Sequence, residues 1–311
     1  MRVAIFGTGG VGGYFGGRLA LAGADVTFIA RGAHLDAIRT SGLAVESPAG
    51  NFVISPARAE SDPAPVGAVD FVLVGTKAWQ VTEAGLAMRP MIGAQTIVIP
   101  LQNGVEATPQ LTASLGADHV APGLCRISSF VAGPGRIRHV GVTPEIAFNW
   151  IDGRSDSRLE ALRCAFASAG VAASIPGDIE ADLWAKLALI SSMSGVGAVT
   201  RAPVGVQRSV PETRRLLDRA IHETAAVARA RGVALAASLE DTTLRYIDTL
   251  PLMMVASMHR DIAEGRPSEL EFQNGSVVRL GRGSGVPVPV HEFIYSSLLP
   301  LEQRARGQLQ F

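Results

Sequence analysis

The chain has 311 residues, with 28 Lys and Arg against 28 Asp and Glu, so its net charge is zero. This balance excludes the basic excess typical of proteins that bind nucleic acid or an anionic membrane surface, and leaves a small molecule as the expected partner. Hydrophobic residues make up 47% and charged residues 18%, which is a globular composition. Cys125 and Cys164 lie far apart, and the histidines show no metal-binding spacing. We therefore expect a cytoplasmic protein without a disulfide framework or a metal.

The first part of the chain alternates short apolar runs with helical patterns. The runs predicted to form strands are Arg2–Gly7, Asp25–Ala30, Asp70–Gly75 and Thr96–Leu101. Near-continuous apolar runs are typical of parallel strands that are buried on both faces. The helices predicted between them are Val11–Ala22, Ala33–Thr40 and Ala78–Met88. This alternation predicts an α/β fold with a doubly wound sheet.

Later segments depart from this alternation. Leu43–Ser55 and Val131–Gly141 are predicted to turn back as hairpins, the second at Gly133-Pro134-Gly135. The predicted domains are 1–172, containing the sheet, and 173–311, which is all-α. Apolar residues at spacings of three and four predict helices at Asp178–Ala198, Pro211–Arg231, Leu239–Ile247, Leu252–Ala263, Leu270–Arg282 and His291–Arg304. The most apolar tract, Leu183–Val199, carries a lysine and three serines, so it is interpreted as a buried helix and not as a membrane span.

The segment GTGGVG directly follows the first predicted strand and opens a helix. It fits the pattern GxGxxG, whose glycines permit a tight turn, a close approach of the backbone to a pyrophosphate, and close packing of helix on strand. The new helix offers its N–H groups and positive dipole end to phosphates. We therefore predict a dinucleotide site of the Rossmann type; the alternative is a glycine-rich turn without a ligand. Its predicted residues are Gly7, Thr8, Gly9, Gly10, Val11 and Gly12.

The residues after the second predicted strand indicate which dinucleotide binds. NAD sites usually carry an acidic residue there, which accepts a hydrogen bond from the ribose 2′-hydroxyl. This chain instead has Arg31, which offers a forked cation to a 2′-phosphate, and no carboxylate to repel one. We predict NADP(H), with a solvated surface arginine as the alternative. Lys77 and Asn103 follow the next two strands, where ligands bind in open sheets, and are candidate cofactor or substrate contacts.

Lys186 lies in an apolar helical pattern, with Leu183 and Ile190 on the same face. A lysine in a cleft of low dielectric has a lowered pKa and exchanges protons near neutrality. Reduction of a carbonyl needs such a group, because a cation must stabilise and protonate the forming alkoxide. A lysine that lies along apolar surface with its charge in water is an equally good interpretation of the periodicity. Glu269 or Asp261 could hold this lysine in place, and Ser257 could bind a substrate carboxylate; each would otherwise be a solvated helix residue.

These segments together resemble the ketopantoate reductases (2-dehydropantoate 2-reductases), over essentially the whole chain. The matching segments are GTGGVG, Arg31, TKAWQ at Thr76–Gln80, NGVE at Asn103–Glu106, LWAKLA around Lys186, and the pair of Ser257 and Glu269. The resemblance implies a Rossmann domain, a helical domain and a cleft between them, and reduction of a 2-keto acid by NADPH. It also implies that Lys186 is the general acid, that Asn103 contacts cofactor and substrate, that Ser257 binds substrate and that Glu269 lies by the cofactor. In the pantothenate pathway the product is pantoate.

The substrate half of the resemblance is incomplete. Family members commonly carry asparagines four and eight residues after the catalytic lysine, where this chain has Ile190 and Ser194, and Pro203-Val204 lies near the place of a third. We keep Ser194 as a candidate substrate contact. A pocket without those amides would lose hydrogen bonds that select a substrate hydroxyl, so a paralogue acting on another 2-keto acid is an alternative. A 3-hydroxy acid or opine-type dehydrogenase and a non-catalytic NADP-binding sensor are further alternatives. A homodimer is compatible with the long helices, but nothing in the sequence requires it.

Overall fold

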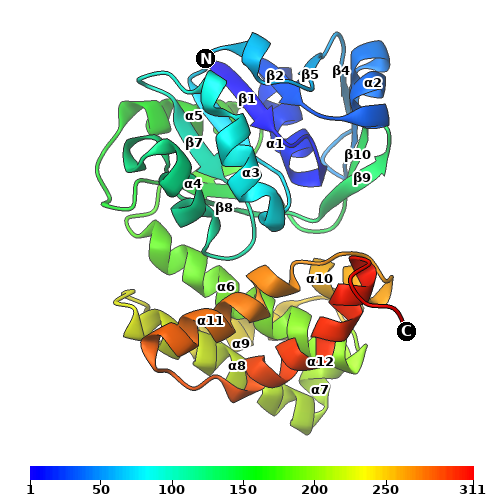
Figure 1. The fold of residues 1–311 in the computed structure, drawn as a ribbon, viewed down its shortest axis with the longest axis vertical. Coiled ribbons are helices and arrows are strands. Elements are labelled where there is room, and N and C mark those ends of the chain that lie inside the picture. The colour runs from blue at the N-terminus through cyan, green and yellow to red at the C-terminus, as the bar shows by residue number, and fades with distance from the viewer. The chain divides into compact units, whose positions relative to one another are not determined.

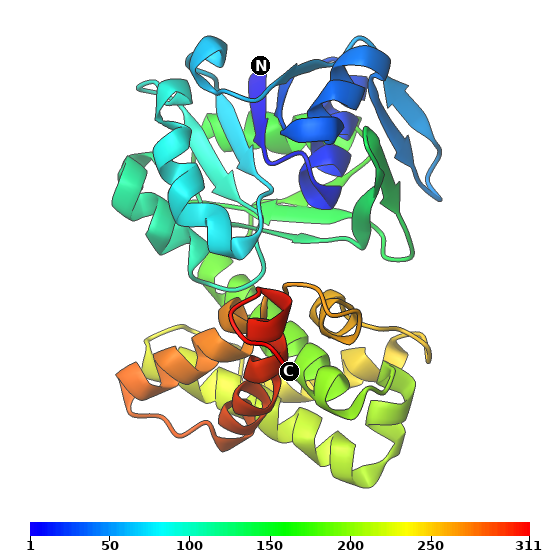
Figure 2. The ribbon, with the colours of Figure 1, turned by 45° about the vertical axis from the view of Figure 1, so that its right-hand side comes forward.

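The computed structural model describes residues 1–311, which form two compact units (Figures 1 and 2). The first unit comprises Met1–Gln102 and Ala107–Ile179, and the second comprises Asn103–Glu106 and Glu180–Phe311. The second unit begins somewhat later than position 173, because β12 (Ala172–Ser174) pairs with β11 (Glu145–Phe148) and continues a sheet of the first unit.

The central sheet of the first unit has five parallel strands in the order β5–β2–β1–β6–β7. Their bounds are Arg2–Phe6 for β1, Asp25–Ile29 for β2, Arg58–Glu60 for β5, Phe71–Val74 for β6 and Ile97–Pro100 for β7. All four predicted strands therefore exist, and the predicted α/β fold class is confirmed. Strand β5 was not predicted; it is only three residues long and lies at the edge of the sheet.

Helices cover both faces of this sheet. Val3 and Ile5 of β1 point into one apolar cluster, which holds side chains of α1, α2 and α5. Ala4 and Phe6 point into the other, with side chains of α3 and α4. The helices are α1 Gly10–Leu21, α2 Gly32–Ser41, α3 Val81–Ala87, α4 Ala107–Leu115 and α5 Ser157–Ser168, with short 3₁₀ turns at Ala64–Val66, Ala78–Gln80, Arg89–Met91 and Ala117–His119. Burial on both faces explains the near-continuous apolar runs in β1, β6 and β7. Neither α4 nor α5 was predicted.

Two smaller sheets complete the first unit. One has the order β4–β3–β10–β9, and the other β12–β11–β8. The new strands are β3 Leu43–Glu46, β4 Phe52–Ile54, β8 Gly123–Arg126, β9 Ser129–Gly133 and β10 Arg136–His139. Both predicted hairpins are confirmed, since β3 pairs antiparallel with β4 and β9 antiparallel with β10.

The second unit is helical, as predicted. Its helices are α6 Ile179–Thr200, α7 Val204–Ser209, α8 Pro211–Ala230, α9 Leu239–Thr249, α10 Ser257–Ala263, α11 Asn274–Ser284 and α12 Pro289–Ala305, with a 3₁₀ turn η5 at Leu270–Phe272. The predicted helix Leu252–Ala263 is too long at its start. Residues before Ser257 form a connection whose carbonyl oxygens, on Leu252 and Met254, accept hydrogen bonds from the first N–H groups of α7. The short helix α7 was not predicted, and Gln273 separates η5 from α11.

Helix α6 is long and apolar enough, by length and composition alone, to cross a membrane. Its most apolar window has a mean hydropathy of 1.3, and 72% of that window is buried inside the structure. This burial is typical of the core helix of a globular protein, because a membrane span exposes its apolar surface to lipid.

A fully buried polar network ties α6, α8, α11 and α12 together. Asn274 Nδ2 donates to the carbonyl oxygen of Ser191 at 3.1 Å and to His291 Nδ1 at 3.0 Å. His291 Nε2 lies 2.9 Å from both Thr224 Oγ1 and the carbonyl oxygen of Ala220. These partners set the neutral tautomer that carries its proton on Nε2. A second proton on Nδ1 would face the Asn274 amide, so the network requires an uncharged imidazole.

Acid is therefore expected to destabilise the fold through His291. Burial lowers the pKa of His291 to about 4, against roughly 6.5 in the unfolded chain. The unfolded state binds the proton first, so the free energy of unfolding falls by about 3 kcal/mol as the pH drops from roughly 6.5 to 4. Denaturant titrations of the wild type and of His291→Gln across this range would measure the difference. Equal pH dependence in both proteins would contradict the role of His291.

Candidate functional site

The glycine turn lies between β1 and α1, at the point where the order of the sheet reverses. Strands β2 and β6 flank β1, and the chain leaves β1 toward β2 on one side and returns to β6 on the other. Ligands bind at such a switch point in open α/β sheets. Gly7 has a φ of +98°, in the left-handed region, and a Cβ there would lie 2.6 Å from the amide nitrogen of Thr76. Only glycine adopts this φ without strain and also has no Cβ to collide with Thr76.

The start of α1 offers backbone donors. The first helical hydrogen bond runs from the amide of Gly13 to the carbonyl of Gly9 at 2.7 Å, so the amides of Gly10, Val11 and Gly12 precede the helical ladder. A Cβ on Gly9 would have a single neighbour within 4 Å, the carbonyl oxygen of Gly75 at 3.8 Å. Space is therefore open above Gly9, as binding of a phosphate at a helix N-terminus requires.

Gly12, the last glycine of the pattern, and the adjacent Gly10 serve packing. A Cβ on Gly12 would overlap the carbonyl oxygen of Gly7 and lie 2.8 Å from Ile5 Cγ2, which agrees with a role in packing helix on strand. A Cβ on Gly10 would collide with the backbone of Ser129 at the start of β9, a constraint that the sequence did not reveal. The hydroxyl oxygens of Thr76 and Ser129 are buried without a hydrogen-bond partner. The turn is thus bordered by polar atoms that a bound nucleotide could satisfy, and these residues fit a dinucleotide.

His34 fixes the glycine turn from outside, and the sequence analysis assigned it no role. Its Nε2 donates to the carbonyl oxygen of Thr8 at 2.8 Å, and its Nδ1 accepts from the amide of Gly135 at 3.0 Å. The imidazole therefore joins α2 to the turn and to the hairpin of β9 and β10. Thr8 is also held from its other side, because its hydroxyl donates to the carbonyl oxygen of Ile29 at 3.0 Å.

Removal of this imidazole is expected to loosen the turn. His34→Ala would leave a backbone donor and a backbone acceptor without their partner, at a cost of about 1 to 3 kcal/mol. We expect lower thermal stability and weaker binding of NADPH, followed by the fluorescence of the bound nucleotide. His222→Ala is the matched control, since the His222 side chain is 57% exposed on the second unit. Unchanged nucleotide affinity in His34→Ala would contradict the positioning role.

Arg31 lies at the end of β2, where it precedes α2. Its side chain is 70% exposed, and its Nη2 lies 3.9 Å from Glu83 Oε1. The prediction that no carboxylate lies near Arg31 is therefore wrong. Glu83 is far away in the sequence and comes from α3, which follows β6, so tertiary structure alone brings it there. Lys77 lies on the same connection after β6, with Nζ 5.7 Å from the centre of the Trp79 ring, in cation–π geometry.

The second unit places Lys186 on α6 with only 8% of its surface exposed. Its neighbours Trp184 and Leu187 belong to an apolar cluster with side chains of α8 and α11. Lys186 is therefore a largely buried residue on a helix that packs other, apolar side chains against α8 and α11.

Asn103 and Glu269, which are far apart in the sequence, meet in the second unit. Asn103 Nδ2 donates to Glu269 Oε2 at 3.0 Å, and Glu269 is 9% exposed. Gly104, with a φ of +99°, lies so close to Phe272 that a Cβ would come within 2.6 Å of its carbonyl oxygen. Glu106 pairs with Arg279 at 2.7 Å. The NGVE segment is therefore fastened to the helical unit, although it directly follows a strand of the first.

Neighbouring contacts fix Glu269. The carboxylate of Glu302 accepts hydrogen bonds from the amide of Ser268, at 3.1 and 3.0 Å, and from its hydroxyl at 2.5 Å. Arg306 Nε donates to the same carboxylate at 2.6 Å. Glu302 was not predicted, because its position in a helical pattern does not distinguish it from a solvated residue.

Residues 3–152 match the family described as "Ketopantoate reductase PanE/ApbA", and residues 178–302 match "Ketopantoate reductase PanE/ApbA C terminal". The chain belongs to the ketopantoate reductase family. Membership makes it an oxidoreductase and confirms the resemblance inferred from its motifs.

Three relatives show how far the similarity extends. The uncharacterized oxidoreductase YkpB of Bacillus subtilis is 30% identical over 298 residues, which cover 96% of this chain and 98% of that protein. A 2-dehydropantoate 2-reductase of Halobacterium salinarum is 29% identical and covers 98% of this chain and 99% of its own length. The crystal structure of a PanE/ApbA family ketopantoate reductase from Ralstonia eutropha has a TM-score of 0.89 at 34% identity, and covers 98% of this chain and 100% of its own.

The remaining candidates of this ketopantoate reductase family member lie in different surroundings. Ser257 is exposed at the first position of α10. Ser194 is 1% exposed on α6. Ile190 packs against the apolar cluster that contains Trp184 and Leu187. Asp261 accepts from Arg266 Nη2 at 2.6 Å, so it already serves an ion pair.

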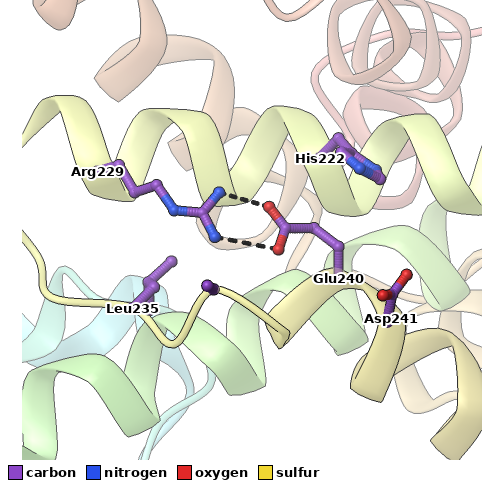
Figure 3. Close-up of a pocket in the computed structure, with 6 residues that line it drawn as sticks. His222, Arg229, Leu235, Glu240 and Asp241 are labelled. Carbon is purple, nitrogen blue, oxygen red and sulfur yellow. Dashed lines mark hydrogen bonds and ion pairs between the residues drawn. The ribbon is translucent and has the colours of Figure 1, made fainter.

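A pocket of about 420 Å³ lies elsewhere on the second unit, between α8 and α9 (Figure 3). It is lined by His222, Arg229, Leu235, Ala237, Glu240 and Asp241. The Arg229 guanidinium points at Glu240 and forms a two-pronged ion pair with it (Figure 3). This hydrogen bond holds the pKa of Glu240 below its usual range. The arginine in the pocket is thus engaged within the protein, and none of the predicted site residues lines it.

Proposed function

We propose that this protein is an NADPH-dependent reductase that converts a 2-keto acid to the 2-hydroxy acid, with 2-dehydropantoate as the leading substrate. The observation that carries the proposal is Lys186, a lysine residue that is only 8% exposed on an apolar helix of a ketopantoate reductase family member. A solvated surface lysine, the plain alternative, would keep its ammonium in open water. The relatives named 2-dehydropantoate 2-reductase support the choice of substrate.

The chemistry follows from the residues present. A bound nicotinamide would supply the hydride to the carbonyl carbon. Lys186 would donate a hydrogen bond from Nζ to the carbonyl oxygen, stabilise the negative charge that develops there, and transfer its proton to give the hydroxyl. Lys186 then regains a proton from water. One keto acid, one NADPH and one proton are consumed for each hydroxy acid and NADP⁺ formed.

Asn103 and Glu269 would position the reactants. One N–H of the Asn103 amide is held by Glu269 at 3.0 Å. The amide retains its second N–H and its carbonyl oxygen, which are available to cofactor or substrate. The exposed hydroxyl of Ser257 is suited to the substrate carboxylate. In the first unit, the glycine turn would hold the pyrophosphate, and Arg31 and Lys77 would hold the adenosine end.

The test is NADPH oxidation with 2-dehydropantoate, then with a panel of other 2-keto acids, with NADH in parallel. Rapid turnover of 2-dehydropantoate would support the proposal and show that Ile190 and Ser194 are compatible with that substrate. Nucleotide binding without turnover of any keto acid would contradict it and favour a sensor.

A different 2-keto acid is the second candidate, and Ile190 favours it. This side chain packs against an apolar cluster where the family carries a polar amide. A pocket that loses a hydrogen-bonding group also loses discrimination for a substrate hydroxyl. Preference within the panel for a keto acid with an apolar side chain, over 2-dehydropantoate, would establish this candidate.

A further inference from the structure

The pair of Arg31 and Glu83 lies at the edge of the sheet where the adenosine end of a dinucleotide would bind. Arg31 follows β2, and Glu83 lies in the first turn of α3, which follows β6. These two strands are the neighbours of β1, whose carboxyl end carries the glycine turn. The distance from Arg31 Nη2 to Glu83 Oε1 is 3.9 Å. Both residues belong to the first unit.

A second carboxylate near this edge is already engaged. Glu60 of β5 lies beside the end of β2, where its carbonyl oxygen accepts from the amide of Ala30 at 3.0 Å. Its carboxylate is paired with Arg39 at 2.5 Å. Glu83 is therefore the carboxylate that faces Arg31.

The pair contributes little to folding. The side chains of Arg31 and Glu83 are 70% and 74% exposed, and exposed ion pairs stabilise proteins weakly. We expect the pair instead to affect the affinity for a charged ligand that also binds Arg31. A 2′-phosphate carries nearly two negative charges, so it would compete with Glu83 for the guanidinium and be repelled by the carboxylate. A 2′-hydroxyl carries no charge and can donate to that carboxylate.

We propose that Glu83 sets cofactor choice, by lowering affinity for the 2′-phosphate of NADPH while accepting the 2′-hydroxyl of NADH. Arg31 would bind the 2′-phosphate of NADPH, and Glu83 the 2′-hydroxyl of NADH. The wild-type protein therefore uses both cofactors, and its preference for NADPH over NADH is smaller than Arg31 alone would give. The inference rests on the proposed function only in assuming a nicotinamide dinucleotide.

The test compares Glu83→Gln with the wild type in calorimetric titrations with adenosine 2′,5′-bisphosphate and with ADP, which lacks the 2′-phosphate. We expect the variant to bind the bisphosphate roughly three- to tenfold more tightly, with ADP unchanged or weaker. The gain should shrink at high salt, because exposed charges are screened. Glu212→Gln is the matched control, since Glu212 forms an exposed pair with Arg215 at 3.0 Å on the second unit.

The outcomes separate this inference from the proposed function, because binding of these nucleotides needs no turnover. An unchanged ratio of bisphosphate to ADP affinity in Glu83→Gln would overturn the role of Glu83 alone. An equal gain in Glu212→Gln would overturn it as well, since the effect would then be one of net charge. Failure of the wild type to bind either nucleotide would overturn both the inference and the proposed cofactor. A matching rise in the ratio of kcat/KM for NADPH over NADH would extend the result to the reaction.

Discussion

Replacement of Lys186 by alanine is expected to lower kcat by a factor of about 10² to 10⁴, which is the usual contribution of a positioned general acid. The alkoxide that forms on hydride addition would lose both its stabilising charge and its proton donor. Binding of NADPH should remain, because the glycine turn and Arg31 lie in the other compact unit. The glycine turn offers backbone donors to the pyrophosphate, and Arg31 is the predicted ligand of the 2′-phosphate. Stopped-flow or steady-state NADPH oxidation would measure the rate, and nucleotide fluorescence the affinity.

Lys186→Met is the companion variant. Methionine keeps much of the aliphatic volume at this buried position, so it separates loss of the amine from loss of packing. Both variants should lose the same large factor in kcat. A methionine variant with near wild-type turnover would show that Lys186 has a packing role and that another group protonates the product.

Gly9→Ala is expected to abolish tight nucleotide binding without damaging the fold. Gly9 has φ −81° and ψ −162°, which alanine adopts readily, and its Cβ would meet nothing closer than 3.8 Å. The added methyl group would instead occupy the open space at the start of α1. We expect the dissociation constant for NADPH to rise roughly tenfold or more, equivalent to about 1.4 kcal/mol or more. Full affinity in this variant would mean that the phosphates bind elsewhere.

Gly12→Ala, unlike Gly9→Ala, should lower the stability of the fold. Its Cβ would overlap the carbonyl oxygen of Gly7 and press on Ile5, so the free energy of unfolding should fall by about 1 to 3 kcal/mol. Gly283→Ala is the control, because that helical glycine has nothing within 4 Å of its Cβ. Alanine there should stabilise by roughly 0.5 to 1 kcal/mol. Denaturant titrations would compare the free energies of unfolding of the Gly9, Gly12 and Gly283 variants. An unchanged free energy of unfolding in Gly12→Ala would contradict the packing role of Gly12.

Local patterns in the sequence predicted most of the fold. The continuous apolar strands and the hairpins that turn at Pro48–Asn51 and Gly133–Gly135 depend on nearest neighbours and on glycine and proline backbone preferences, which are visible in the sequence. One error falls where a local pattern competes with a distant contact. Leu252 and Met254 fit a helical spacing, but their carbonyl oxygens bind the start of α7 instead.

The sequence by itself determined the sheet, the helical second half, the glycine turn and the family, because each depends on residues that are close together along the chain. Only the tertiary structure decided what these residues face. It brought Glu83 to Arg31, Glu269 to Asn103 and His34 to Thr8. Each pair joins elements whose separation in the sequence leaves no periodic signal. The order of parallel strands brings the first and third of these pairs together at one edge of the sheet. The second pair forms within the helical unit, to which Asn103 and Glu269 both belong.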